Sequence, residues 1–439
     1  MKLHFFTVND IEDFRKNYRF AGEMKDFKKI STARTAEEFD QEFFCYLIKR
    51  AYDVPQEIFE TKIYGETGID GLRLDFNFGL RLDVPEGNFR VKISDFDSEE
   101  IFFDKYISGG RLISVENYFI RWHVEVFLDE EKVFTHTLDL EGQPVAVKLN
   151  SPALGDQISM LPYLREFKKF HRCNLFFCPS KILRELVAQL YPDIQLVDEI
   201  NFETYATYYP DMILSVFPLN PADYRKVSMT RVAGVLLGID YLPPKNFFKP
   251  TAPPVTNDPY VCIAVQAKNA RKSWHWPGGW DIVVDYLKSL GYRVFCIDKN
   301  ATEENDGLKI SMPAGAENFT GNRPLLERAN MIHHAEFFIG LSSGLAWLAD
   351  AVNCPVVMIC GFSQDWFEFY TPYRVANRKV CNGCFNDPRT SFLQIKCTFH
   401  KDTPREFECQ KKISPRMVIN AIERLIVDKN LIPPALKNF

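Results

Sequence analysis

The chain has 439 residues, a formal net charge of −5, a pI of about 6.0 and an apolar fraction of 46%. The length predicts two or three domains, and the apolar fraction is ordinary for a soluble globular protein. The acidic balance argues against nucleic acid as a partner, since phosphate binding needs clustered Lys and Arg. No apolar run is long enough to span a bilayer, so we expect no membrane insertion.

The cellular location is predicted from the N-terminus and the cysteines. The N-terminal sequence MKLHFFTVNDIEDF reaches acidic residues too early for a signal peptide. Seven of the eleven cysteines are scattered through apolar or strand-like segments, which is typical of buried thiols in a reducing compartment. We therefore expect a cytoplasmic protein.

The first third of the chain divides into two parts. Residues 1–60 are predicted to form an N-terminal helical extension, with a helix over Ala36–Tyr52. In residues 61–149, apolar and polar residues alternate over Ile120–Leu128 and Val133–Leu140, on either side of a short turn. Such alternation predicts paired antiparallel strands. We therefore expect a small antiparallel β-rich domain over residues 61–149.

The rest of the chain alternates strands and helices, as two α/β units do. Residues 150–241 predict a first Rossmann-like domain, and residues 260–439 a second one. Residues 242–259 contain six prolines and predict an extended, semi-rigid linker. The expected fold class is α/β, with two Rossmann-like domains facing a crevice. The predicted strands are Val145–Leu149, Leu175–Cys178, Gln195–Val197, Met212–Phe217, Val261–Val265, Arg293–Asp298, Glu336–Gly340 and Pro355–Cys360, and the helices are Lys181–Leu190, Gly279–Leu290, Arg323–His333, Gly344–Val352 and Ser414–Ile426.

The segment Asn150–Phe170 predicts a glycine-containing turn followed by a helix, and Asp156 lies where that helix starts. In an open α/β sheet such a turn lies at the carboxyl end of a strand, where ligands bind. Asp is also a common N-cap, and this segment alone favours the N-cap interpretation. Asp156 is therefore a candidate catalytic carboxylate with a structural alternative.

The segment GLSSGLAWLADAV, residues 340–352, predicts a strand end followed by a helix start. Ser342 and Ser343 can cap that helix, and Gly344 lets backbone approach a ligand. Free N–H groups and the positive dipole end make such a helix start suitable for a diphosphate. Ser342, Ser343, Gly344 and Leu345 are therefore the candidate cofactor-binding residues here.

The segment QAKNARKSWHWPGGW, residues 266–280, joins a predicted strand to a predicted helix. Its basic and aromatic residues include Lys268, Lys272 and Trp274. Lys272 beside Trp274 could neutralise a phosphate leaving group while the aromatic rings exclude water. The alternative is a solvated basic loop with tryptophans in the core.

Four cysteines lie close together near the C-terminus: Cys381 and Cys384 as C-x2-C, then Cys397 and Cys409. Their spacing suits a closed tetrathiolate metal site, in which the metal is structural because no coordination position stays open. His400 is a possible substitute ligand. Four independent buried thiols are the alternative, but the surrounding sequence is polar and free Cys prefers apolar sites.

The motifs together resemble those of ADP-heptose glycosyltransferases of GT-B fold, and more closely the bacterial autotransporter heptosyltransferases. The resemblance covers about residues 80–430 and leaves out the first 60 or so. The residues that carry it are Gly155–Leu164, Lys272–Pro277, Asn322–Ala329, Gly340–Ala349, Thr371–Val375, Pro85–Val91 and the four clustered cysteines.

The resemblance implies an enzyme that moves heptose from ADP-glycero-manno-heptose to Ser or Thr hydroxyls of an autotransporter passenger protein, with inversion. It implies Asp156 as the catalytic base and the loop with Lys272 as part of the donor site. It also implies one structural iron per subunit, with zinc as the alternative, and a large ring-like homo-oligomer, a dodecamer.

Two departures bear on the substrate. Lipopolysaccharide heptosyltransferases usually carry Asp and His where this chain has Ser342 and Trp347, which favours the protein-modifying branch. Lys268 stands where relatives tend to have a small hydroxyl residue, so we expect the phosphate contacts to be rearranged, with Lys268 among them. The alternatives are a lipopolysaccharide-core heptosyltransferase and a non-catalytic scaffold that uses its metal knuckle and β module for binding.

Overall fold

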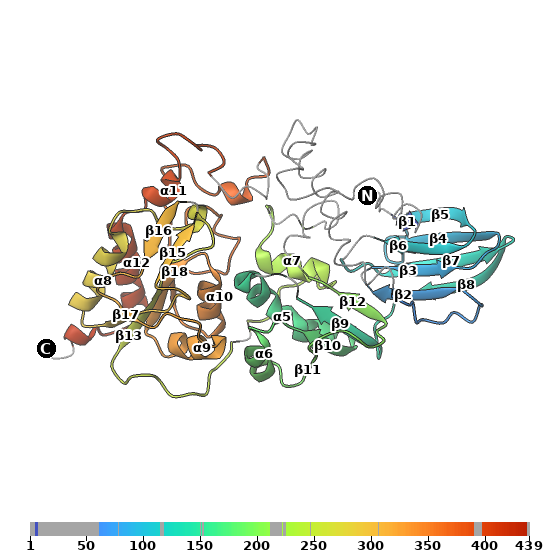
Figure 1. Ribbon diagram of the computed structural model, residues 1–439, viewed down its shortest axis with the longest axis horizontal. Coiled ribbons are helices and arrows are strands. Elements are labelled where there is room, and N and C mark those ends of the chain that lie inside the picture. The colour runs from blue at the N-terminus through green and yellow to red at the C-terminus, as the bar shows by residue number, and fades with distance from the viewer. Residues whose placement is uncertain are drawn as a thin grey trace.

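The computed structural model describes residues 5–7, 61–77, 79–114, 118–149, 151, 153–210, 222, 225–245, 247–305, 307–389 and 397–436. An antiparallel sheet lies at one end, an α/β half with α5, α6 and α7 in the middle, and a second α/β half at the other end (Figure 1). The predicted helix over Ala36–Tyr52 and the predicted strand over Met212–Phe217 lie outside the described residues. No helix in the described ranges is long and apolar enough to cross a membrane.

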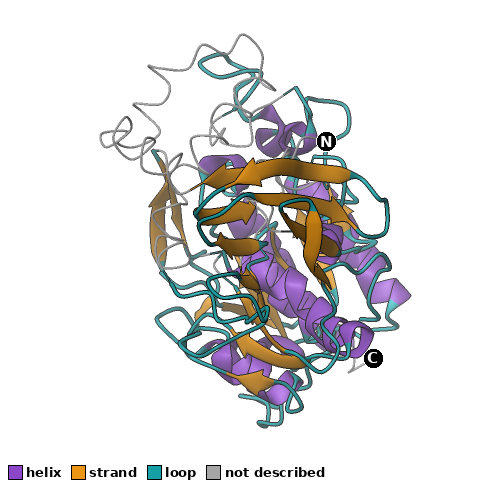
Figure 2. Cartoon of the chain, turned by 90° about the vertical axis from the view of Figure 1, so that its right-hand side faces the viewer, coloured by secondary structure: helices purple, strands orange, loops and turns teal. Residues whose placement is uncertain are grey.

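The predicted antiparallel β module is confirmed. Its four-stranded sheet has the order β5-β4-β7-β8, and every neighbouring pair is antiparallel. Alternate residues such as Val91, Ile93, Val124 and Val126 are fully buried, as the alternating sequence requires. Figure 2 shows strands of this end of the molecule in front of the helices of the α/β halves. The strands are β4 (Phe89–Asp95), β5 (Ile101–Ile107), β7 (Trp122–Leu128) and β8 (Glu131–Thr137).

The first α/β half shares one mixed sheet with strands that precede it in sequence. The order is β1-β6-β3-β2-β12-β9-β10-β11, antiparallel from β1 to β2 and parallel from β2 onward. The sheet therefore continues across the boundary predicted at residues 149 and 150, and the predicted domain limits stay predictions. The strands are β1 (Phe5–Thr7), β2 (Arg73–Asn77), β3 (Arg81–Val84), β6 (Gly110–Ser114), β9 (Pro144–Lys148), β10 (Asn174–Cys178), β11 (Gln195–Leu196) and β12 (Ala206–Tyr208).

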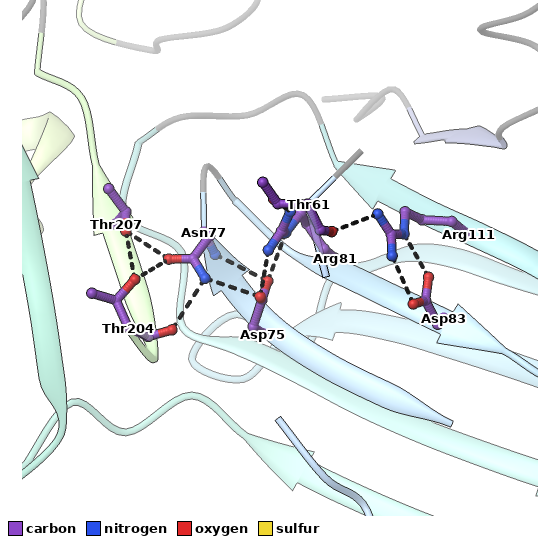
Figure 3. Close-up of polar contacts among 8 residues, drawn as sticks. All are labelled: Thr61, Asp75, Asn77, Arg81, Asp83, Arg111, Thr204 and Thr207. Atoms are coloured by element: carbon purple, nitrogen blue, oxygen red, sulfur yellow. Dashed lines mark hydrogen bonds and ion pairs between the residues drawn. The ribbon is translucent and has the colours of Figure 1, made fainter. Parts of the chain in front are cut away.

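A buried polar network joins the antiparallel and parallel parts of this sheet (Figure 3). The Arg81 guanidinium donates to Asp75 through Nε at 2.8 Å and Nη2 at 2.5 Å, and both side chains are almost fully buried. The Asn77 amide donates to Asp75 and to the Thr204 carbonyl, and its oxygen accepts from the Thr204 and Thr207 hydroxyls. β2, β3 and β12 are therefore joined by side chains as well as by backbone.

The helices of the first half cover this sheet. They are α5 (Leu154–His171), α6 (Arg184–Leu190) and α7 (Met229–Leu236). The apolar residues of α5 are buried, and Phe167 packs edge-to-face on Tyr208 of β12 with ring centroids 5.5 Å apart. α5 begins at Leu154 with Ala153 as its N-cap. Asp156 is therefore the third residue of the helix, and the N-cap interpretation is wrong.

The second half is a parallel α/β sheet, as predicted. Its order is β17-β14-β13-β18-β19-β20, and all neighbours are parallel. A hairpin, β15 (Thr302–Asn305) with β16 (Leu308–Ser311), was not predicted. The remaining elements are β13 (Tyr260–Ala264), α8 (Gly279–Ser289), β14 (Arg293–Cys296), β17 (Glu317–Asn318), α9 (Leu325–His333), β18 (Phe337–Leu341), α10 (Gly344–Ala351), β19 (Val356–Ile359), β20 (Arg374–Val375), α11 (Glu408–Lys411) and α12 (Pro415–Asp428).

The proline-rich segment 242–259 has neither helix nor strand among its described residues. From Lys245 onward the segment makes polar contacts with the second half. Lys245 pairs with Asp350 at 2.6 Å, the Phe248 N–H donates to the Ala351 carbonyl at 2.7 Å, and Asn330 donates to the Pro253 carbonyl at 2.9 Å. These contacts begin at Lys245, so the segment joins the second half within its first four residues.

Candidate active site and metal centre

The amino-terminal ends of α5 and α10 meet where the two halves join. A Cβ on Gly155 would lie 2.8 Å from Cδ1 of Trp347, and a Cβ on Gly344 would lie 2.7 Å from Cβ of Leu154. Hydrogen is the only substituent that fits at either glycine. Both helices therefore bring free N–H groups and positive dipole ends to one place, which suits a bound anion.

Asp156 lies at this meeting point. Its Oδ2 accepts a hydrogen bond from the Ser151 hydroxyl at 3.1 Å, and that hydroxyl accepts from the Ala153 N–H at 3.2 Å. Burial raises the pKa of Asp156, whereas the charges of Lys272 and Lys268 oppose that rise. A carboxylate with a raised pKa is a better proton acceptor, which is what a general base needs.

Lys272 and Lys268 belong to the second half, yet their charges reach Asp156 of the first half. Both are on the loop between β13 and α8, which contains a single turn of 3-10 helix, η2 (Ala270–Lys272). The Asn269 side chain caps that turn by accepting from the Lys272 N–H at 3.3 Å. The ammonium group of Lys272 lies 5.3 Å from the ring centroid of Phe362. The structure therefore brings together the residues that the sequence placed on two separate segments.

The serines before α10 differ in what their hydroxyls do. Ser342 is buried and its hydroxyl donates to Glu368 at 2.5 Å, so that proton is not free for a ligand. Ser343 is the N-cap residue of α10, but its hydroxyl has no hydrogen-bond partner among the described residues. Ser343 and the N–H groups near Gly344 and Leu345 are therefore the parts of this predicted site best placed for an anion.

Glu368 is a supporting residue that the sequence did not single out. Its carboxylate accepts from Ser342, from Ser363 at 2.6 Å and from Arg374 at 2.9 Å, and it is buried. These bonds fix the turn between β18 and α10. Arg374 lies in Thr371–Val375, one of the segments that carry the family resemblance. That segment is the signal by which the sequence could have indicated this network.

Trp274, predicted as a donor contact, is a buried residue beneath the loop. Its indole N–H donates to the Ile413 carbonyl at 2.8 Å, and its ring packs edge-to-face on Trp280 with centroids 5.2 Å apart. Gly279 touches the same ring, since a Cβ there would lie 2.8 Å from it. These contacts favour a packing role for Trp274, which was the alternative given for this loop.

The close approach at Gly344 leads to a stability prediction. We expect Gly344→Ala to lower the free energy of unfolding by about 1–3 kcal/mol, because the new methyl group must push Leu154 and α5 away. Urea denaturation followed by tryptophan fluorescence measures this change. Gly315→Ala is the control, since its nearest neighbour would be one methyl group at 3.1 Å. A Gly344→Ala variant as stable as the parent would contradict the close contact.

The four clustered cysteines line a single small cavity. Cys381, Cys384, Cys397 and Cys409 are four of the ten residues that line a space of about 10 Å³, which is room for one ion. None of them is in a disulfide. Burial raises the pKa of the thiols of Cys381, Cys384 and Cys409, so a cation is needed to keep them as thiolates. The residues present therefore fit a structural metal.

A second ligand set shares Cys381 with the first. The Cys381 sulfur, a His400 ring nitrogen and a Glu408 carboxylate oxygen all lie within 4.8 Å of one another. Glu408 already accepts from the Cys381 N–H at 3.0 Å and from Arg405 at 2.6 Å. Because its oxygens are used in this way, we favour the four thiols and keep His400 as the substitute.

Comparison with known families matches two parts of the chain. Residues 68–130 match the family described as "Glycosyltransferase TibC, N-terminal domain", and residues 240–399 match "Glycosyltransferase family 9 (heptosyltransferase)". The first match covers most of the β module. The second covers the parallel sheet, the loop with Lys272 and the start of α10.

Comparison with characterised proteins gives similar relatives over most of the chain. The autotransporter heptosyltransferase TibC of Escherichia coli O78:H11 is 40% identical over 369 residues, which are 82% of this chain and 91% of the relative. The relative BAHTCr of Citrobacter rodentium is 40% identical over 367 residues, 82% of this chain and 90% of that protein. BimC of Burkholderia thailandensis, 32% identical over 82% of this chain and 87% of its own length, is described as an inactive autotransporter heptosyltransferase.

Solved structures agree with these relatives. A crystal structure described as the iron-containing dodecameric glycosyltransferase TibC from enterotoxigenic E. coli H10407 has a TM-score of 0.80 and 38% identity, covering 84% of this chain and 99% of that one. A family 9 glycosyltransferase from Veillonella parvula has a TM-score of 0.50 at 16% identity, with coverage of 66% and 99%, and shares the fold. The fold of the two α/β halves and the family matches define a glycosyltransferase of GT-B type. The chain belongs to the autotransporter heptosyltransferase family.

Proposed function

We propose that the protein transfers heptose from ADP-heptose to serine or threonine hydroxyls of an autotransporter passenger protein, with inversion. The observation that carries the proposal is that the start of α5, with Asp156, meets the start of α10 of the second half, because Gly155 packs against Trp347 and Gly344 against Leu154. A solved relative, 38% identical, is described as a complex with ADP-D-beta-D-heptose. Relatives that are 40% identical are named autotransporter heptosyltransferases.

The proposed reaction is a single displacement. Asp156 accepts the proton of the acceptor hydroxyl while that oxygen forms a bond to the anomeric carbon of heptose. The bond from that carbon to the β-phosphate oxygen breaks, and the electron pair leaves with ADP. Lys272 and the N–H groups at the start of α10 stabilise the charge that develops on the diphosphate. Attack on the face opposite the leaving group inverts the anomeric carbon.

The proposal is tested by intact-mass analysis of a passenger protein after incubation with ADP-heptose and the purified enzyme. We expect mass increments of one heptose per modified hydroxyl. A lipopolysaccharide-core acceptor serves as the second arm, because a core heptosyltransferase is the alternative. Transfer to the glycolipid without transfer to the passenger would replace the proposed acceptor by that alternative.

Lys272 gives the first prediction for the donor site. We expect Lys272→Ala to weaken ADP binding roughly 10–100-fold, because a charge-assisted hydrogen bond contributes about 1.5–3 kcal/mol. Isothermal titration with ADP measures the change. The control is Lys288→Ala, an exposed lysine of α8 that contacts the Gly315 carbonyl. Equal affinities of the parent and the Lys272 variant would remove Lys272 from the donor site.

The second class of function is a non-catalytic scaffold, and one relative of this family is described as inactive. Family membership alone therefore does not establish turnover in this chain. The convergence of Asp156, Lys272 and the two helix ends supports catalysis, because a scaffold has no need of a base facing a cationic loop. Saturable ADP binding with no transfer to any acceptor would favour the scaffold.

The remaining assignments rest on relatives. We propose one structural iron per subunit on the four cysteines, with zinc as the alternative, because a solved relative is described as iron-containing. When bound, the metal supplies a fixed anchor for the cysteine-bearing segments. We also propose a dodecamer, which is the assembly given for that relative, and a cytoplasmic location, where free thiols persist.

A further inference from the structure

One buried hydroxyl in the turn before α5 holds the carboxylate of Asp156. Ser151 is 3% exposed, and its hydroxyl makes two hydrogen bonds. It accepts from the Ala153 N–H at 3.2 Å and donates to Oδ2 of Asp156 at 3.1 Å. A hydroxyl has a single proton, so the proton of Ser151 is directed at the carboxylate. Ser151 therefore stabilises the charged form of Asp156 and fixes which of its oxygens is bonded to the protein.

A second buried side chain fixes Ser151 in place. Gln157 follows Asp156 in α5 and is 2% exposed. Its Nε2 donates to the Ser151 carbonyl at 2.6 Å, and its backbone N–H donates to the Ala153 carbonyl at 3.2 Å. The first bond determines how the amide is oriented, because a carbonyl accepts and cannot donate. Gln157 thus ties the turn that contains Ser151 to the helix that carries Asp156.

The other polar group of the Gln157 side chain is unused. Its oxygen, Oε1, is buried and has no hydrogen-bond partner among the residues that the structure describes. Burying an amide with one of its polar groups unsatisfied costs free energy, so a glutamine is a poor choice for packing alone. The bond to the Ser151 carbonyl is what this side chain adds that an apolar residue of similar size could not. The identity of residue 157 is therefore explained by its effect on the turn.

The two carboxylate oxygens of Asp156 differ in their bonding. Oδ2 accepts from Ser151, whereas Oδ1 has no hydrogen bond to any residue in the described part of the chain. The charges that act on the carboxylate come from the loop between β13 and α8, from Lys272 and Lys268. The facing helix α10 contributes Trp347, which is uncharged and packs on the residue before Asp156. Oδ1 therefore has its lone pairs available for an acceptor hydroxyl.

We propose that Ser151 and Gln157 are positioning residues that hold Oδ2 of Asp156 and so present Oδ1 as the atom that takes the proton of the acceptor hydroxyl. The inference rests on the proposed function, in which Asp156 is the base. The proton moves from the acceptor oxygen to Oδ1 while that oxygen bonds to the anomeric carbon and ADP leaves, and the Ser151 proton stays on Ser151. Ser151 acts through the carboxylate, and Gln157 acts through Ser151.

The experiment measures initial rates of heptose transfer from ADP-heptose to a passenger protein as a function of pH, with the full chain. Ser151→Ala removes the bond to Oδ2, Ser151→Thr keeps a hydroxyl, and Gln157→Met removes the bond to the Ser151 carbonyl. Ser159→Ala is the matched control, because Ser159 is 1% exposed and its hydroxyl donates to the backbone carbonyl of Asp156 at 2.7 Å. That change removes a hydrogen bond to the same residue but spares the carboxylate. Titration with ADP shows whether the donor site is intact.

We expect Ser151→Ala to lower kcat about 10-fold or more, because a hydrogen bond to a charged group is lost. The acid limb of kcat/KM should move to higher pH, since that bond lowers the pKa of Asp156, and raising the pH should recover part of the rate. Ser151→Thr should restore most of the activity. Gln157→Met should lower kcat by itself but change it little when added to Ser151→Ala. Ser159→Ala should keep the acid limb of the parent, and all variants should keep its ADP affinity.

The inference is overturned if Ser151→Ala keeps the kcat and the acid limb of the parent, or if Ser151→Ala and Gln157→Met lower kcat additively. If Ser151→Ala does not fold, Gln157→Met decides the matter, because a normal kcat in that variant contradicts a need for the bond to the Ser151 carbonyl.

A second measurement needs no acceptor. The difference in the free energy of unfolding between a protein with Asp156 and its Asp156→Asn variant depends on pH through the pKa of Asp156 in the folded state. In the Ser151→Ala background this dependence should move to higher pH, and an unchanged dependence would contradict the role of Ser151. Absence of transfer to any acceptor by the parent would instead refute the proposed function. The two failures are therefore distinguishable.

Discussion

Asn in place of Asp156 is expected to lower heptose transfer roughly 10²–10⁴-fold, the usual contribution of a positioned base. Asn keeps the size of the side chain and can still bond to Ser151, but it cannot accept the proton. The measurement is initial rate of transfer at saturating donor and acceptor. The control is Asp193→Asn, an exposed carboxylate of the same half that pairs with Lys168 and Arg165. Near-normal turnover by the Asp156→Asn variant would end the catalytic assignment.

The stability of the Asp156→Asn variant shows whether a loss of activity comes from catalysis or from unfolding. Burial raises the pKa of Asp156 above its unfolded value, so the folded state favours the protonated form. Its contribution to stability is therefore largest below the unfolded pKa and is lost as pH rises through the folded pKa. At pH 7 the ionised carboxylate is a cost, and the neutral amide should leave the free energy of unfolding equal or higher. For the parent, the acid limb of kcat/KM should lie above the pKa of an ordinary Asp.

The largest expected loss of stability comes from the buried pair between Asp75 and Arg81. Arg81→Met leaves the Asp75 carboxylate buried without its main partner, and breaking such a pair typically costs about 3–5 kcal/mol. The measurement is the free energy of unfolding in urea. Asp75→Ala should also lower the free energy of unfolding, because it removes the carboxylate that accepts from Nε and Nη2 of Arg81.

A double-mutant cycle distinguishes the loss of the ion pair between Asp75 and Arg81 from a simple loss of packing. The double variant, Asp75→Ala with Arg81→Met, should cost clearly less than the sum of the single changes, because neither partner then remains as an uncompensated charge. Arg90→Met, which removes the bidentate pair to Asp104 on the exposed face of the β module, is the control and should cost far less than either buried change, because water screens an exposed pair. Additive single changes at the buried pair would contradict the network in Figure 3.

Local periodicity was enough to predict most elements of the two α/β halves. Strands such as Val261–Val265 and helices such as Gly279–Leu290 match β13 and α8 within a residue, because apolar runs and glycine or proline boundaries determine them locally. The continuation of β2, β3 and β6 into the parallel sheet was missed, since a strand's sequence shows which face is buried and not which strand lies beside it. The hairpin β15–β16 is largely polar and gave no apolar signal.

The sequence predicted Asp156, Lys272 and Gly344 as site residues, and their roles stay predictions; it did not indicate the residues that support them. Asp156, Lys272 and Gly344 lie on or just after connections that follow strands, and parallel topology brings such connections to one edge of a sheet. What Ser342 and Trp274 do depends on partners far along the chain, Glu368 and Ile413, which no local pattern indicates.

The proline-rich segment limits how the two halves can move. Tyr241 is held by the first half, since its hydroxyl donates to Glu166 at 2.7 Å and its carbonyl accepts from Tyr163 at 3.2 Å. Lys245 is already held by Asp350 of the second half. Any bend in the segment is thus confined to residues 242–244, of which Pro243 and Pro244 have φ fixed by their rings. Any movement of one half relative to the other must therefore be made through very few backbone torsion angles.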